Sequence, residues 1–126
     1  MLWTVIMSDE YEQWFLELPV QAQEAIATDL EVLQIMGPQL GRPYVDHIKG
    51  SRFPNMKELR TRVKRNVYRS LFAFDLERQA VLLVGGDKKG KKEKSFYQQL
   101  IARADSIFER HLQNQRKDIE KINKQN

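Results

Sequence analysis

Two arginines, Arg60 and Arg69, lie in two segments whose apolar and polar residues alternate as they do in β-strands. A two-residue turn at Lys64 and Arg65 would join these segments in a hairpin and place Arg60 directly opposite Arg69. A three-residue turn would send Arg69 to the other face and break up the apolar set there. The sequence therefore predicts an arginine pair on one face of a sheet, with Glu58 and Arg62 beside it.

Two directly opposed arginines destabilise a sheet by roughly 0.2–1 kcal/mol unless an anion lies between them. A phosphate group would suit that position, because guanidinium forks bind phosphate oxygens bidentately. The alternative is that a carboxylate of the chain itself, from Glu58, Asp75 or Glu77, neutralises the pair. The pattern alone favours neither possibility.

A lysine-rich loop and a tyrosine follow in the sequence. A four-residue turn over 75–78 would pair Arg69 with Val84 and bring the loop after Gly85-Gly86 close to the arginines. Tyr97, one turn into the last helix, could stack on a base or, beside several cations, lose its proton more easily. The alternative for Tyr97 is an aromatic that only covers the sheet edge. The lysines of the loop are Lys88, Lys89, Lys91 and Lys92.

These residues could cleave RNA without a metal. Such cleavage needs a base for the ribose 2′-hydroxyl, cations for the phosphorane and an acid for the leaving 5′-oxygen. Glu58 could be the base, Arg60 and Arg69 the cations, and Tyr97 or a lysine such as Lys88 the acid. We expect no cofactor and no metal, because no carboxylate cluster could hold paired magnesium ions. The residues expected to contact RNA are Lys57, Arg62, Lys89, Lys91 and Lys92.

The charges are segregated along the chain. Residues 1–41 contain no lysine or arginine and carry seven acidic residues, whereas residues 57–92 have a net charge of +7. A basic face of this kind favours an anionic partner such as nucleic acid. The chain has no cysteine for a disulfide or a zinc–thiolate site, and no apolar run long enough to cross a membrane. We expect a cytoplasmic protein that does not bind membranes.

The elements that must position these residues can be predicted from periodicity. Residues 3–7 predict a strand, Ser8 an N-cap, and residues 9–18 a helix; Pro19 is expected to begin a second helix that Gly37-Pro38 ends. An irregular connection over 40–55 should precede three strands, and Ser95 should cap a last helix. The predicted fold class is α+β, with the helices on one side of a mainly antiparallel sheet whose other face is open. Residues 1–112 would form one domain, and 113–126 a polar tail that frays.

Three short motifs resemble the HigB-like branch of the RelE/ParE toxin superfamily. They are a Leu-Arg strand at Leu59-Arg60, a Tyr-Arg-x-x-Phe strand at 68–72, and a glycine–lysine loop at 86–88. The resemblance implies a RelE-like fold, with two N-terminal helices and a C-terminal helix packed on the sheet. It also implies a toxin of a type II toxin–antitoxin system that cleaves mRNA on the ribosome and inhibits translation. Arg69 would contact the phosphate, while the general base stays open because Glu58 stands where the best-known relative has lysine.

The resemblance leaves two activities open. Some members of the superfamily are mRNA endonucleases, and others inhibit DNA gyrase without nuclease activity. The arginine pair, the basic loop and Tyr97 favour the endonuclease. The implied partners are mRNA, the ribosome and a cognate antitoxin of the helix-turn-helix type. Of the two histidines, His111 is predicted to pack or cap, and His47 either to have a structural role or to line the rim of the site.

Overall fold

Ser8 joins the first strand to the first helix in this computed structural model, which describes residues 1–125. Its hydroxyl accepts a hydrogen bond from the Tyr11 amide and donates one to the Leu83 carbonyl, so the predicted N-cap is confirmed. The elements in chain order are β1 (Val5–Met7), α1 (Asp9–Leu16), α2 (Val20–Met36), the 3₁₀ helix η1 (Gly37–Gln39), β2 (Val45–His47), β3 (Lys57–Val63), β4 (Asn66–Phe74), β5 (Ala80–Asp87) and α3 (Glu93–Gln125).

The five strands form one sheet in the order β1-β5-β4-β3-β2, in which only β1 and β5 pair in parallel. The register predicted for the first hairpin is confirmed, because Arg60 pairs with Arg69. The register predicted for the second hairpin is wrong. The turn has one more residue than expected, Gln79, and a bulge at Leu83 adds another, so Arg69 pairs with Gly86 instead of Val84.

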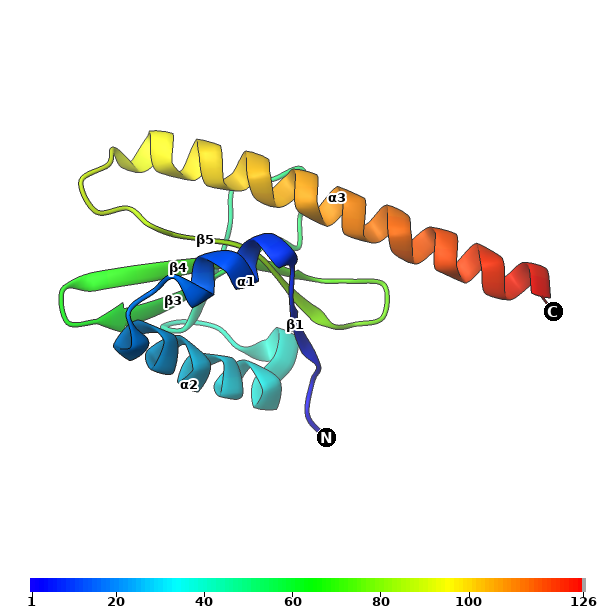
Figure 1. Cartoon of the computed structure of the whole chain (residues 1–126), viewed down its shortest axis with the longest axis horizontal. Helices are drawn as coiled ribbons and strands as arrows, with labels where there is room; N and C mark the ends of the chain where they lie inside the picture. Colours follow the sequence, from blue (N-terminus) through cyan, green and yellow to red (C-terminus); the bar gives the residue numbers. More distant parts are fainter. Residues whose placement is uncertain (126) are drawn as a thin grey trace.

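Helices cover both faces of the sheet, so the expectation of an open face is wrong (Figure 1). On one face, Tyr11 of α1 and Leu33 of α2 pack with Phe72 and Leu82. On the other, the apolar stripe of α3 packs on Leu71 and its neighbours in β4 and β5. The alternating side chains of β5 serve both cores, as expected of a strand in which residues 80–84 are continuously apolar.

Several element boundaries differ from the prediction; β1 begins at Val5 instead of residue 3, and α1 ends at Leu16 instead of residue 18. The connection over 40–55 contains the short strand β2. Pro19 precedes the second helix as its N-cap instead of occupying its first position. Strand β5 continues through Gly85-Gly86 to Asp87. Helix α3 begins at Glu93, so Ser95 lies inside the helix and the predicted cap there is wrong. The helix continues to Gln125, so the fraying expected from residue 113 onward is wrong as far as residue 125.

The turn between β4 and β5 anchors the middle of α3. The buried carboxylate of Asp75 accepts hydrogen bonds from His111 Nε2 at 2.8 Å and from Gln115 Nε2 at 2.9 Å. Burial alone would raise the pKa of Asp75, but the bonds from His111 and Gln79 hold that pKa below its usual value. His111 is therefore a packing residue, as predicted. None of the helices described here is long and apolar enough to cross a membrane.

Replacing Leu83 with alanine is expected to lower the free energy of unfolding by about 2–5 kcal/mol. The Leu83 side chain is fully buried between β5 and α3, so its loss leaves a cavity. Urea denaturation of both proteins measures the change. The matched control is Leu76→Ala in the β4–β5 turn, where the leucine is 48% exposed. Equal midpoints for Leu83→Ala and the parent would contradict the buried position of Leu83.

Candidate active site

Three side chains, one each from β3, β4 and α3, meet at the buried carboxylate of Glu58, which is 1% exposed. Arg60 Nε donates to Glu58 Oε1 at 2.7 Å, and Arg69 Nη1 donates to the same oxygen at 3.3 Å. The Tyr97 hydroxyl donates to Glu58 Oε2 at 2.5 Å. In this structure the anion between the two arginines is thus the carboxylate of Glu58, one of the two possibilities that the sequence left open.

The pKa values of two neighbours of this carboxylate, Arg60 and Tyr97, are raised. The hydrogen bond to Glu58 raises the pKa of Arg60 above its ordinary value. Burial, followed by the hydrogen bond to Glu58, raises the pKa of Tyr97 well above its ordinary value of 10.0. The expectation that nearby cations make Tyr97 easier to deprotonate is therefore wrong, because burial and Glu58 outweigh Arg69 and Arg60. At neutral pH Tyr97 is a proton donor.

Arg69 is the most enclosed cation of this cluster, with 11% of its side chain exposed. Its guanidinium carbon lies 5.6 Å from the centre of the Tyr97 ring. Its Nε is buried and has no hydrogen-bond partner within residues 1–125. An unsatisfied buried donor costs about 1–3 kcal/mol, and a catalytic role or a bound water or ion is among the explanations for such a group. Arg69 therefore retains a donor for a further acceptor.

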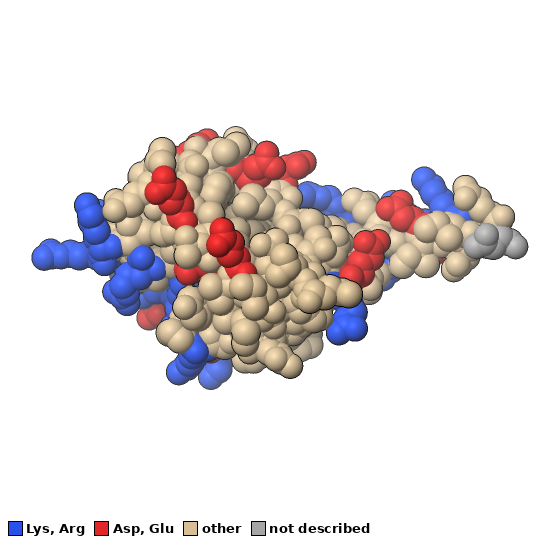
Figure 2. All heavy atoms as spheres, turned by 90° about the horizontal axis from the view of Figure 1, so that it is seen from below, with Lys and Arg blue, Asp and Glu red and all other residues tan. Residues whose placement is uncertain are grey.

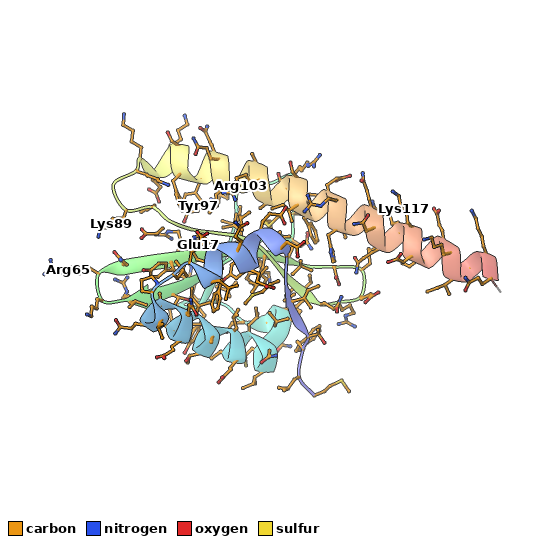
Figure 3. All side chains as sticks on the ribbon, viewed as in Figure 1. Glu17, Arg65, Lys89, Tyr97, Arg103 and Lys117 are labelled. Carbon is orange, nitrogen blue, oxygen red and sulfur yellow. The ribbon has the colours of Figure 1, made fainter. Side chains whose placement is uncertain are left out.

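Two adjacent glycines in β5 set the height of the helices above the sheet. A Cβ atom at Gly85 would collide with the Trp14 ring of α1, and one at Gly86 would lie 2.9 Å from the Phe96 ring of α3. The Phe96 ring also packs edge-to-face against Tyr97, with 5.2 Å between ring centres. Close packing on Gly86 therefore helps place Tyr97 within reach of Glu58. In Figure 3, Tyr97 points from α3 toward the sheet.

The basic loop between β5 and α3 lies beside Arg69, as predicted. Lys88, Lys89 and Lys91 line a cavity of about 360 Å³ together with Arg69 and Arg65. Lys88 Nζ lies 3.5 Å from a carboxylate oxygen of Glu93. Basic side chains gather at this end of the molecule, over the β3–β4 turn and the loop (Figure 2). Lys89 and Arg65 are labelled there in Figure 3.

The structure separates three of the predicted RNA-contacting residues from the cluster. Lys57 lies on the opposite face of β3, because side chains alternate along a strand; its Nζ donates to the Pro38 carbonyl at 3.0 Å. Arg62 lines a second groove, between α2 and β3, which shares only Arg60 with the cluster. Lys92 is exposed at the end of the basic loop and does not line the cavity beside Arg69.

Residues before β3 that sequence reasoning did not assign also contribute. Asp46 of β2 gives Arg60 a second carboxylate at 3.5 Å. His47 and Ile48 form one wall of a larger cavity that begins at the cluster, so the possibility that His47 lines the rim is confirmed. β2 is only three residues long and has no readable periodicity, so no sequence signal pointed to it. Within residues 1–125 no three His, Asp or Glu side chains group as metal ligands would.

Comparisons with known proteins agree with this fold. A solved structure of a doubly substituted mutant of the Escherichia coli toxin RelE, in the free state, superposes with a TM-score of 0.56 at 13% sequence identity. The match covers 81% of this chain and 96% of that one. This chain therefore has the α+β fold of RelE, with the helices and mainly antiparallel sheet expected from the resemblance.

The sequence comparisons define the family. The family described as "Phage derived protein Gp49-like (DUF891)" matches residues 13–109. HigB3 of Mycobacterium tuberculosis is 44% identical over 108 residues, which are 86% of this chain and 92% of HigB3. HigB2 of the same organism is 40% identical over 111 residues, 87% of this chain and 54% of HigB2. The chain belongs to the Gp49-like family, within the HigB-like branch of the RelE superfamily.

Proposed function

We propose that this protein is the toxin of a type II toxin–antitoxin system and cleaves mRNA on the ribosome. Its relatives HigB3 and HigB2 are named as toxins, which supports the first part of the proposal. The second part depends mainly on one observation, the Glu58–Arg60–Arg69–Tyr97 cluster next to the lysine loop. A protein that inhibits DNA gyrase without nuclease activity has no need of this arrangement.

In the proposed reaction, a phosphate of the mRNA binds between Arg60 and Arg69 and displaces part of their bonding to Glu58. The freed carboxylate oxygen accepts the proton of the ribose 2′-hydroxyl, whose oxygen attacks the phosphorus. The arginines, as pre-positioned hydrogen-bond donors, stabilise the charge of the phosphorane. Tyr97, protonated at neutral pH, releases its bond to Glu58 and donates its proton to the leaving 5′-oxygen, which yields a 2′,3′-cyclic phosphate and a 5′-hydroxyl. The proton held by Glu58 then returns to Tyr97.

Primer extension on cellular mRNA after induced expression tests the proposal. New 5′ ends at defined positions within codons are expected for the parent and none for Arg60→Ala. Gyrase-dependent supercoiling of a plasmid is measured in the same cells. Intact mRNA together with relaxed plasmid would refute the endonuclease function and support inhibition of gyrase instead.

The proposal includes a cognate antitoxin, and the HigB-like branch points to one of the helix-turn-helix type. Co-expression with the reading frame adjacent to this gene should restore growth and yield a complex of the two proteins on purification. Growth arrest that persists during co-expression, with no complex formed, would exclude that neighbour as the antitoxin.

Replacing Lys88 and Lys91 with alanine should weaken RNA or ribosome binding and flatten its salt dependence. Each lost phosphate contact lowers the slope of log K against log salt by about 0.7 on a single strand, hence by about 1.4 for both. Binding measured at several salt concentrations gives the slope. The matched control removes Lys117 and Lys121 from the projecting part of α3, far from the site (Figure 3). Equal slopes for both double variants would exclude a specific role for the loop.

Removal of bound metals should leave cleavage unchanged, because the proposed cations are all side chains. Protein treated with EDTA and desalted is compared with untreated protein on ribosomes kept assembled in magnesium. Equal single-turnover rates are expected, and added zinc or manganese should not raise them. A rate that falls after treatment and recovers with one metal would refute the metal-free mechanism.

A further inference from the structure

The cluster forms only one end of a cavity of about 650 Å³ that the proposed bond cleavage does not use. Glu58, Arg60 and Tyr97 line that end, and the cavity continues between residues 47–50 and α3. Its volume is within the range of small-molecule sites, about 300–1,000 Å³. It can therefore hold more of the substrate than a phosphate group.

An apolar slot, lined by Ile48, Ile101 and Ala102, forms the middle of the cavity. Ile48 and Ile101 both line it and both pack into the core beneath α3. Gly50 comes close to Ile101, since a Cβ atom there would lie 3.9 Å from Ile101 Cδ1, and its φ of +97° favours glycine. Ala102 adds a small exposed side chain from α3. The face of an aromatic ring can pack on these apolar side chains.

The far wall is polar and held in place. Asp105 of α3 accepts hydrogen bonds from Ser51 Oγ at 2.5 Å and from the Arg52 amide at 3.1 Å, which fasten the loop to the helix. Nearer the cluster, Gln98 follows Tyr97 in α3 and is exposed, so its amide is accessible both as a donor and as an acceptor. His47, whose strand partner Lys57 adjoins Glu58, lines the same part of the cavity and can stack on a base. The loop and helix thus form the walls before any substrate binds.

We propose that this cavity binds an unstacked nucleobase of the mRNA, next to the phosphate held by Arg60 and Arg69. The cavity combines the surfaces that a nucleotide needs, with a cation at the cluster end for the phosphate, apolar side chains for the ring, and Gln98 and His47 for the edge and face of the ring. Single-stranded RNA is commonly recognised in this way, through bases splayed out of the strand. The inference depends on the proposed ribonuclease function and adds a base-recognition site to it.

The test is a heteronuclear NMR titration of the full-length protein with four 3′-nucleoside monophosphates and, separately, with inorganic phosphate. Nucleotides should shift the amides of residues 47–50 and 98–105, whereas phosphate should shift only those around Arg60 and Arg69. Ala102→Leu should fill the slot and weaken nucleotide binding by about five- to 150-fold, the range for loss of one stacked base, while phosphate binding stays unchanged. Gln99→Leu, an exposed position of α3 outside the cavity, is the control.

Cleavage of programmed ribosomes by the same variants separates the two claims. Ala102→Leu should change which positions are cut, and Gln99→Leu should cut as the parent does. If nucleotides shift no more amides than phosphate does, and Ala102→Leu cuts at the parent's positions, the base site is refuted while the ribonuclease function stands. If nucleotides bind in the slot but the parent cuts no mRNA, the ribonuclease function fails and base binding remains.

Discussion

Arg69→Ala is expected to abolish growth arrest and to reduce the rate of single-turnover mRNA cleavage by roughly 10²–10³-fold. This is the usual effect of losing one pre-positioned hydrogen-bond donor to the anionic transition state. Arg69 is enclosed, bonds to Glu58 and keeps a buried Nε without a partner in residues 1–125. In the variant, Glu58 still has hydrogen bonds from Arg60 and Tyr97, so the fold should persist. Cleavage of programmed ribosomes measures the rate, and near-ultraviolet circular dichroism tests the fold.

Two further variants separate geometry from charge. Arg69→Lys keeps the positive charge but loses the planar fork, so most of the activity should still be lost. Arg65→Ala removes one charge from the β3–β4 turn at the same end of the molecule and should only weaken binding. A folded Arg69→Ala protein that cuts mRNA as fast as the parent would exclude Arg69 from the chemistry.

Tyr97→Phe should lower the cleavage rate by about 10²–10⁴-fold, the usual effect of removing a general acid. The phenylalanine ring can still stack on a base and pack against Phe96, so substrate binding should change little. Tyr97→Ala should lose stacking as well, worth about 1–3 kcal/mol per base. Single-turnover rates at saturating enzyme, with binding measured separately, distinguish the two contributions.

The pH profile adds a second measurement. Because the pKa of Tyr97 is raised above 10.0, its proton is lost only at higher pH, and its ionisation should not reduce the rate anywhere below pH 10.0. Tyr44→Phe, an exposed tyrosine outside the cluster, is the matched control and should cut normally. If the Tyr97→Ala protein were as active as the parent, Tyr97 would only cover the sheet edge. Lys88 would then be the remaining candidate for the general acid.

The first hairpin was predictable from sequence because its turn is short and its faces differ strongly in polarity. One residue of slip would have sent Arg69 to the face that packs against α1 and α2, so the register followed from the alternation. The second hairpin gave no such signal. Ala80–Val84 is apolar on both faces, so a shift of its register costs nothing in hydrophobic pattern, and the bulge at Leu83 was invisible.

The sequence predicted which residues form the cluster but not how they bond to one another. Alternation placed Glu58, Arg60 and Arg69 on one face, yet nothing in the sequence showed that Glu58 bonds to both arginines. The effect on Tyr97 was missed for a related reason. The sequence indicated that Tyr97 lies near cations. It did not indicate that Tyr97 is partly buried under α3, because the second face of the sheet was expected to be open.

The glycine pair of β5 has a consequence for how this chain can vary. Gly85 and Gly86 each lie under an aromatic ring, one from α1 and one from α3, so even a methyl group there would wedge a helix away from the sheet. Displacement of α3 would carry Tyr97 with it and break its bond to Glu58. Two positions that have no side chain and touch no substrate thus constrain the chemistry as tightly as the residues that perform it. Substitutions there should impair function in protein that still folds, as long as the sheet itself survives.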